Sequence, residues 1–151
     1  MSQGRSEPFQ TLHHLCIVVR DIESSRRNYE ALGIGPWRDY PPLDSYTHLN
    51  VANRDAFMQL RYMMCDLENV QLQLCQPPQL DCAQRRFLDE HGEGVFHISF
   101  ETDLEAAEQI TADRGIGILV SGRRDDGSGF TYFDTQASTG VMIAGRRTTN
   151  P

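Results

Sequence analysis

Two histidines stand at equivalent places in a pattern that the chain states twice, 82 to 83 residues apart. The copies read His14, Asp21-Ile22-Glu23 and Gly33-Ile34-Gly35, then His97, Asp103-Leu104-Glu105 and Gly115-Ile116-Gly117. A repeat of this length indicates a duplicated supersecondary unit rather than a short stacking repeat. Each copy places a histidine at the start of an apolar run. Two imidazoles that face one cavity would be the beginning of a metal site.

The elements that must position these histidines follow from apolar periodicity and from turn residues. Each copy predicts a strand, then a helix that an aspartate caps and a glycine ends, then further strands. The expected strands are 12–19, 56–65, 69–76, 95–101, 130–134 and 140–144, with helices at 22–32, 80–91 and 103–114. Residues 37–55 are expected to be loop-like with short strand pieces, and 121–129 to form a turn. Helices on one face of a largely antiparallel sheet give an α+β architecture.

Strand alternation assigns the candidate residues to faces. In each strand one face is apolar enough to pack on a helix, and the other is mixed, as the lining of a cup would be. His14, His97 and Gln73 fall on the mixed face, and Ser99 and Glu101 share the face of His97. His13 is expected to point to the opposite side of its strand.

Composition limits the function classes. The chain has 151 residues and a net charge of −7, which favours one globular domain and argues against nucleic acid or an anionic membrane as partner. There is no lysine, so Schiff-base catalysis and a P-loop lysine are excluded. No apolar run approaches the roughly 20 residues of a membrane span. The polar first ten residues lack a secretory layout, and the four cysteines are expected to be free thiols, so we expect a cytoplasmic protein.

Three stretches resemble the vicinal oxygen chelate superfamily, which includes glyoxalase I, bleomycin-resistance proteins and extradiol dioxygenases, and most of all its methylmalonyl-CoA epimerase-like branch. They are His14-Leu-Cys-Ile-Val-Val-Arg-Asp-Ile, Val70-Gln-Leu-Gln-Leu-Cys-Gln-Pro77 and Phe87-Leu-Asp-Glu-His-Gly-Glu-Gly-Val-Phe-His-Ile98. The resemblance implies two βαβββ modules that form a cup-shaped mixed sheet. We expect a single domain over 1–151, with module one at 11–78, a connector at 79–93 and module two at 94–147. A homodimer is also implied.

In that superfamily a divalent metal is held by the first and last strands of each module. The resemblance therefore implies His14, Gln73 and His97 as metal ligands. Two imidazoles and an amide oxygen would suit Zn, Ni, Co or Mn, and a metal-free site is the alternative. In that alternative the two histidines hydrogen-bond each other, water or substrate.

The fourth ligand position falls at Ala144, where the resemblance implies a glutamate that binds metal and often serves as the base. Alanine can do neither. A second family carboxylate aligns with Arg61, which could instead hold an anionic group through two parallel hydrogen bonds, if it is not simply an exposed strand residue.

Four further side chains are candidates for binding or proton transfer. Glu101 is the nearest spare carboxylate and a candidate substitute base, and Ser99 lies on the same face. The phenol of Tyr132 could orient a substrate, and His48 lies in the loop-like region where a lid would sit. For Tyr132 a core position, and for His48 a solvated loop, are the alternatives.

These residues favour a lyase- or isomerase-type enzyme that acts on a small oxygenated substrate with a carbonyl or carboxylate group. In it a metal would polarise the carbonyl and stabilise an enolate-like intermediate. Because of Ala144, two alternatives stay open. One is a metal-free binding protein that sequesters a drug-like ligand. The other is a tailoring enzyme of natural-product biosynthesis that uses the same cup.

Overall fold

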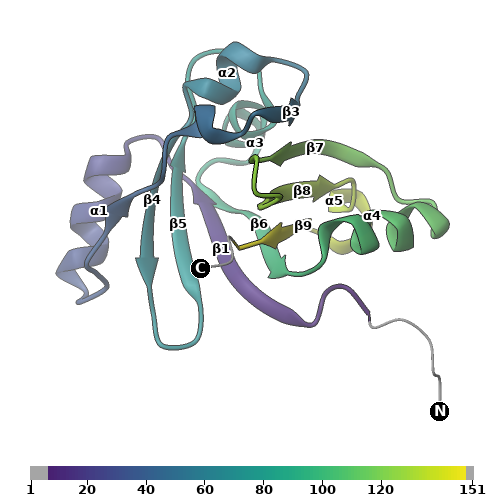
Figure 1. Ribbon diagram of the computed structural model, residues 1–151. Coiled ribbons are helices and arrows are strands. Elements are labelled where there is room, and N and C mark those ends of the chain that lie inside the picture. Colours follow the sequence, from purple (N-terminus) through teal and green to yellow (C-terminus); the bar gives the residue numbers. More distant parts are fainter. Residues whose placement is uncertain (1–6, 149–151) are drawn as a thin grey trace.

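The computed structural model describes residues 7–148 and contains one curved nine-stranded sheet within that range (Figure 1). The strands run in the spatial order β2-β4-β5-β1-β6-β9-β8-β7-β3. The strands are β1 (Thr11–Val18), β2 (Arg38–Asp39), β3 (His48–Asn50), β4 (Arg61–Asp66), β5 (Gln71–Gln76), β6 (Gly94–Glu101), β7 (Ile118–Arg123), β8 (Gly129–Phe133) and β9 (Met142–Arg147). The helices are α1 (Ile22–Ala31), the 3-10 turn η1 (Leu43–Ser45), α2 (Arg54–Met58), α3 (Ala83–His91), α4 (Leu104–Asp113) and α5 (Gln136–Thr139).

The sequence repeat corresponds to a repeat in structure. β1 pairs with β5 in parallel and β6 pairs with β9 in parallel, while β1 and β6 meet antiparallel at the centre of the sheet. The two repeated helices begin alike, since Asp21 caps the amide of Ser24 at 3.1 Å and Asp103 caps that of Ala106 at 3.2 Å. Both end at a glycine with positive φ, which is the conformation that stops a helix. The prediction of an α+β fold with a cup-shaped mixed sheet is confirmed.

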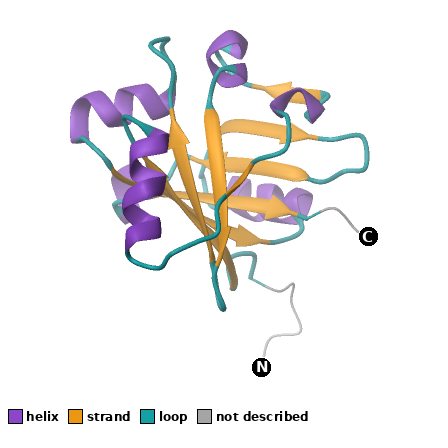
Figure 2. Ribbon diagram, turned by 90° about the vertical axis from the view of Figure 1, so that its left-hand side faces the viewer, coloured by secondary structure: helices purple, strands orange, loops and turns teal. Residues whose placement is uncertain are grey.

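The helices α1 and α4 cover the outer face of the sheet, so the inner face is free to line a cup (Figure 2). Under α1 a small core forms from Val19, Ile22, Met63 and Leu74. A larger cluster of buried residues lies on the inner face, and α3 contributes Leu88 to it. In the described residues no helix is long and apolar enough to cross a membrane.

The segment between β2 and β4 differs most from the sequence prediction. The pattern predicts one strand over 56–65, but Ala56 and Phe57 belong to α2, because the Asn53 side chain accepts a hydrogen bond from the amide of Ala56 at 3.1 Å. The same segment contributes β3, which crosses to pair with β7 on the far side of the sheet. In Figure 1, η1, α2 and β3 lie together over one end of the cup.

The second half differs in smaller ways. The predicted turn at 121–129 is shorter, because β7 continues to Arg123 and β8 begins at Gly129. The last strand begins at Met142, two residues later than predicted, and continues to Arg147. This extension matters for the site, because it places Arg146 on a strand of the cup.

Candidate functional site

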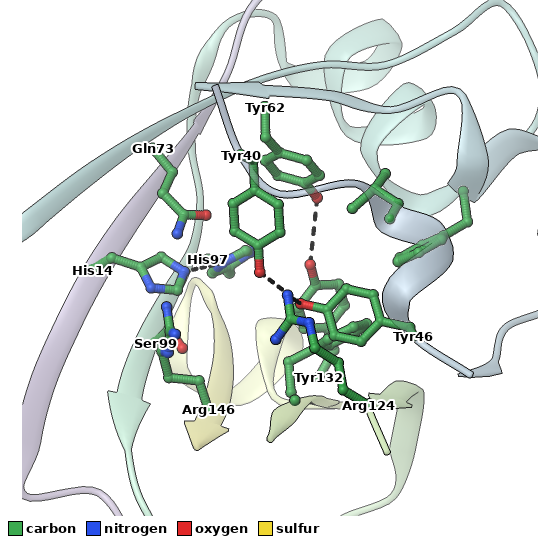
Figure 3. Close-up of a pocket in the computed structure, with 14 residues that line it drawn as sticks. His14, Tyr40, Tyr46, Tyr62, Gln73, His97, Ser99, Arg124, Tyr132 and Arg146 are labelled. Carbon is green, nitrogen blue, oxygen red and sulfur yellow. Dashed lines mark hydrogen bonds between the residues drawn. The ribbon is translucent and has the colours of Figure 1, made fainter. Parts of the chain in front are cut away.

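A narrow pocket, partly open to solvent, lies between the inner face of the sheet and the η1–α2 segment; its empty space is about 470 Å³ when the open mouth is included. Both halves of the repeat contribute to it (Figure 3). Its polar lining residues, in chain order, are His14, Tyr40, Tyr46, Tyr62, Gln73, His97, Ser99, Arg124, Tyr132 and Arg146. Among the described residues that line it there is no aspartate or glutamate.

The two repeated histidines meet at the bottom of this pocket. Their strands are antiparallel neighbours, and the register places His14 opposite Ser99 and Cys16 opposite His97. The Nε2 atoms of His14 and His97 lie 3.0 Å apart, and the residues are only 6% and 2% exposed. The symmetry of the sequence therefore correctly predicted that these side chains would come together.

A β-bulge in β1 brings a third histidine to the pair. The register with β6 shifts between Leu12 and His14, so His13 has no facing residue. Its Nδ1 atom lies 2.8 Å from Nδ1 of His14 and 3.5 Å from the Nη1 atom of Arg146. The expectation that His13 points to the opposite side of the strand is wrong, because strict alternation does not hold through a bulge.

The direction of the hydrogen bonds in this chain of imidazoles depends on their tautomers. In each of the two pairs, at 2.8 and 3.0 Å, one nitrogen donates and the other accepts. Nδ1 of His97, at the end of the chain, is buried and has no hydrogen-bond partner in the described structure.

Burial holds these imidazoles in the neutral form. It lowers the pKa of His14 well below 6.5, an effect to which the charge of Arg146 adds, and it lowers the pKa of His97 to about 3. For His13, burial and then Arg146 lower the pKa to about 4. At neutral pH the positive charge in this part of the pocket therefore comes from the guanidinium.

Gln73 presents a fixed amide to the pocket. Its Nε2 donates to Oε1 of Gln71 at 2.8 Å, and Nε2 of Gln71 donates to Oδ1 of Asp66 at 2.9 Å. Because a carboxylate only accepts, this relay sets the orientation of both amides. The carbonyl oxygen of Gln73 is left as the acceptor available in the pocket (Figure 3).

Tyrosines form the opposite wall. The hydroxyl oxygens of Tyr40 and Tyr46 are 2.6 Å apart, and those of Tyr62 and Tyr132 are 3.5 Å apart. Arg124 donates to the Tyr46 hydroxyl at 3.1 Å and lies 4.3 Å from the centre of its ring. Burial raises the pKa of Tyr46, Tyr62 and Tyr132, so these phenols keep their protons and can donate hydrogen bonds.

Sequence reasoning did not identify Tyr40, Tyr46, Tyr62, Arg124 or Arg146. Tyr62 could have been found, because the predicted hairpin pairs it with Cys75, whose face is that of Gln73. Tyr40 and Tyr46 lie in the segment that was predicted as a loop, where the sequence carries no periodicity.

Of the predicted site residues, His14, Gln73, His97, Ser99 and Tyr132 line the pocket. Three others do not. Glu101 accepts hydrogen bonds from the amide and hydroxyl of Thr148 and lies beyond the pocket lining, so its proposed role as base is not supported by its position. His48 is exposed on β3 and lines a separate surface hollow with Glu105 and Arg123.

Arg61 points away from the cup. Its Nη2 atom lies 3.1 Å from Oε1 of Glu23 on α1, and both side chains are about half exposed. The next residue, Tyr62, lines the pocket instead, because successive side chains of a strand point to opposite faces.

We therefore expect Arg61→Ala to have little effect. An exposed ion pair of this kind contributes roughly 0 to 1 kcal/mol, so the free energy of unfolding should change by less than about 1 kcal/mol. Denaturant unfolding monitored by circular dichroism measures this. A large loss of stability, or a loss of ligand binding in the pocket, would show that Arg61 acts there after all.

The sequence profile of the Glyoxalase/Bleomycin resistance protein/Dioxygenase superfamily matches residues 13–133. The chain belongs to this superfamily. No curated protein sequence matches it. Among solved structures, methylmalonyl-CoA epimerase from Mycobacterium tuberculosis is 19% identical, with a TM-score of 0.73 over 99% of this chain and 94% of that one. A variant of the Streptomyces coelicolor methylmalonyl-CoA epimerase, in complex with 2-nitronate-propionyl-CoA, is 24% identical, with a TM-score of 0.72 over 94% of this chain and 99% of that one. At these identities the likeness shows the fold.

The geometry of His14, Gln73 and His97 indicates how well these residues fit a divalent metal. The 3.0 Å between the two Nε2 atoms is about what two nitrogens ~2.1 Å from one ion would have at a right angle. The rest of the set fits poorly. Ala144 supplies no ligand, Nδ1 of His97 has no hydrogen-bond partner to orient the ring, and the guanidinium of Arg146 lies 3.5 Å from His13, the neighbour of His14. The described residues contain no cluster of three or more His, Cys, Asp or Glu suited to a metal. Metal binding by His14, Gln73 and His97 stays a prediction.

Proposed function

We propose that this protein is an isomerase-type enzyme that acts on a small anionic molecule with a carbonyl or carboxylate group. The observation that carries the proposal is the buried, neutral His14–His97 pair in a pocket that also holds a guanidinium and protonated phenols. Membership of a superfamily that includes enzymes, and a fold shared with epimerases, add support. Neither identifies the substrate.

The pocket has the groups that a proton transfer next to a carbonyl requires. Such a step breaks a C–H bond, moves the proton to a base and leaves the electron pair as an enolate. The imidazoles of the histidine pair are the bases that the pocket offers, and their low pKa would rise when an anionic substrate lies beside them. Phenol hydroxyls and arginine would stabilise the enolate oxygen. Return of the proton to the same carbon completes an isomerisation or an exchange.

Hydrogen exchange in deuterium oxide tests this proposal whatever the final product is. The protein is incubated with methylmalonyl-CoA, phenylpyruvate and 2-phenylpropionate, and deuterium at the carbon next to the carbonyl is measured by mass spectrometry. We expect at least one compound to exchange faster than it does without protein. The double variant His14→Ala/His97→Ala should lower that rate by roughly 100-fold or more, because general-base catalysis contributes about 10²–10⁴-fold.

A matched control is His91→Ala, which removes an exposed histidine at the end of α3, outside the pocket. Its exchange rate should equal that of the wild type. Exchange that survives the double variant would contradict the role of the histidine pair, and no exchange with any of the compounds would count against the proposed reaction.

A second candidate function is ligand binding without chemistry, as in a sequestering protein. Two observations favour it: no carboxylate is among the described residues that line the pocket, and Ala144 stands where the superfamily resemblance implies a glutamate. Binding of a panel compound without exchange would support this second function. A role as a natural-product tailoring enzyme and a cytoplasmic location also stay predictions. The homodimer stays a prediction as well, and light scattering would measure it directly.

A further inference from the structure

Arg146 reaches the histidine pair because of the residue two places before it. Ala144 and Arg146 lie on the same face of β9, which pairs in parallel with β6 so that Ala144 is opposite Ser99. Ala144 ends at its Cβ atom, so no long side chain stands between Arg146 and the histidines. Figure 3 shows the guanidinium directed toward His14, beside Ser99.

The guanidinium is buried without full compensation. The side chain of Arg146 is 16% exposed, and its buried Nε atom has no hydrogen-bond partner in the described structure. Oε1 of Glu101 forms an ion pair with that Nε at 3.7 Å, which is too long for a hydrogen bond, and both oxygens of Glu101 accept from Thr148. In the described structure the contact of Arg146 Nη1 with Nδ1 of His13 is 3.5 Å long, so a ligand oxygen in the pocket would give this charge a closer acceptor.

Arg124, the other arginine of the pocket, is more fully engaged. It donates to the hydroxyls of Ser45, Tyr46 and Ser128 and stacks on the ring of Tyr46. These contacts fix Arg124 as part of the wall. Arg146 is the arginine with an unsatisfied donor next to the candidate base.

We infer that the guanidinium of Arg146 binds a carboxylate of the ligand beside His14, at the place where the superfamily resemblance leads one to expect a metal ion. That this anion is the substrate rests on the proposed function. A planar guanidinium matches a carboxylate through two parallel hydrogen bonds, and the Ser99 hydroxyl is a further donor at the same end.

The rest of the pocket indicates the body of this ligand. The rings of Phe57 and Phe130 are nearly parallel, with an interplanar angle of 12° and centroids 5.9 Å apart, and tyrosines continue the aromatic surface. Flat apolar groups pack well on such surfaces. The ligand class is therefore a small carboxylate with an aromatic or similarly flat body.

Benzoate and its neutral isostere benzamide test this inference. Binding of each is measured by calorimetry and by NMR shift changes, with EDTA present. Wild-type protein should bind benzoate at least tenfold more tightly than benzamide. Arg146→Met should lower benzoate affinity at least tenfold and leave benzamide within about threefold. Arg146→Lys keeps the charge but loses the planar guanidinium, so its benzoate affinity should lie between those of the wild type and Arg146→Met.

Arg114→Met is the matched control, because Arg114 is exposed and paired with Glu7, away from the pocket. It should bind benzoate as the wild type does. A separate titration of metal-free protein with Zn²⁺ alone should show no stoichiometric binding that depends on His14 and His97.

Three results would overturn the inference: benzoate that fails to bind or binds no better than benzamide, an Arg146→Met variant with unchanged benzoate affinity, or stoichiometric Zn²⁺ at the histidines. The wild-type comparison decides the question even if Arg146→Met does not fold. Arg146-dependent benzoate binding together with no deuterium exchange would leave the inference intact and remove the proposed enzymatic function.

Discussion

Mild acid is expected to destabilise the folded protein strongly, because its buried histidines must stay neutral. The pKa of His97 is about 3 in the folded state against 6.5 when exposed, and that of His14 is also lowered. Between pH 3 and 6.5 the unfolded chain binds more protons than the folded chain. The contribution of these histidines to the free energy of unfolding is therefore full well above pH 6.5 and falls as the pH drops through that value. His97 alone contributes up to about 1.4 kcal/mol per pH unit, or roughly 2 kcal/mol between pH 6.5 and 4.5, and His14 adds to this.

Urea unfolding at pH 7.5, 6.5, 5.5 and 4.5, in EDTA, measures this effect. The His97 ring contacts His14 and Tyr132, and no aspartate or glutamate is among the described residues that line the pocket. A His97→Gln variant should have a shallower pH dependence, whereas exposed His91→Ala should match the wild type. A His97 ring that titrates near pH 6.5 by NMR would contradict the prediction.

Gly129→Ala is expected to cost at least about 3 kcal/mol, because the new methyl group has no space. A Cβ at this position would lie 2.0 Å from the carbonyl oxygen of Gly122, a backbone atom of the paired strand β7. The strands would have to separate at the end that supports Phe130. For a domain of this size, the loss corresponds to a fall in Tm of roughly 6–12 °C.

Gly117→Ala is the control for this substitution. A Cβ there meets nothing within 4 Å, so its Tm should change by no more than a degree or two. Differential scanning calorimetry of both variants measures the contrast. Equal melting temperatures for Gly129→Ala and the wild type would show that β7 and β8 do not pack as described.

The fold and the centre of the site could be predicted because they depend on periodic features. The duplicated pattern identified two equivalent modules, and strand alternation placed His14, Gln73 and His97 on one face. Caps at Asp21 and Asp103 and glycine stops then fixed the helices. Alternation and caps depend on residues near one another in sequence, and the duplication shows the same local pattern in both halves of the chain.

The remainder of the site depends on features that have no period. The bulge in β1 brings His13 next to His14. On β4 the pocket is lined by Tyr62 and not by the predicted Arg61, because neighbouring residues of a strand point to opposite faces. Tyr40 and Tyr46 come from a non-repeated segment whose position over the cup is set by the pairing of β3 with β7. Arg146 was not predicted because the expected last strand ended at Ala144, whereas β9 continues to Arg147.

The central claim is that an arginine, together with neutral histidines, makes this pocket a site for an anionic ligand. A crystal structure of the protein grown with both benzoate and Zn²⁺, with anomalous diffraction at the zinc edge, tests it most directly. We expect the carboxylate within hydrogen-bond distance of Arg146 and no zinc between His14 and His97. Zinc bound by those two histidines and Gln73, with benzoate elsewhere, would contradict the claim.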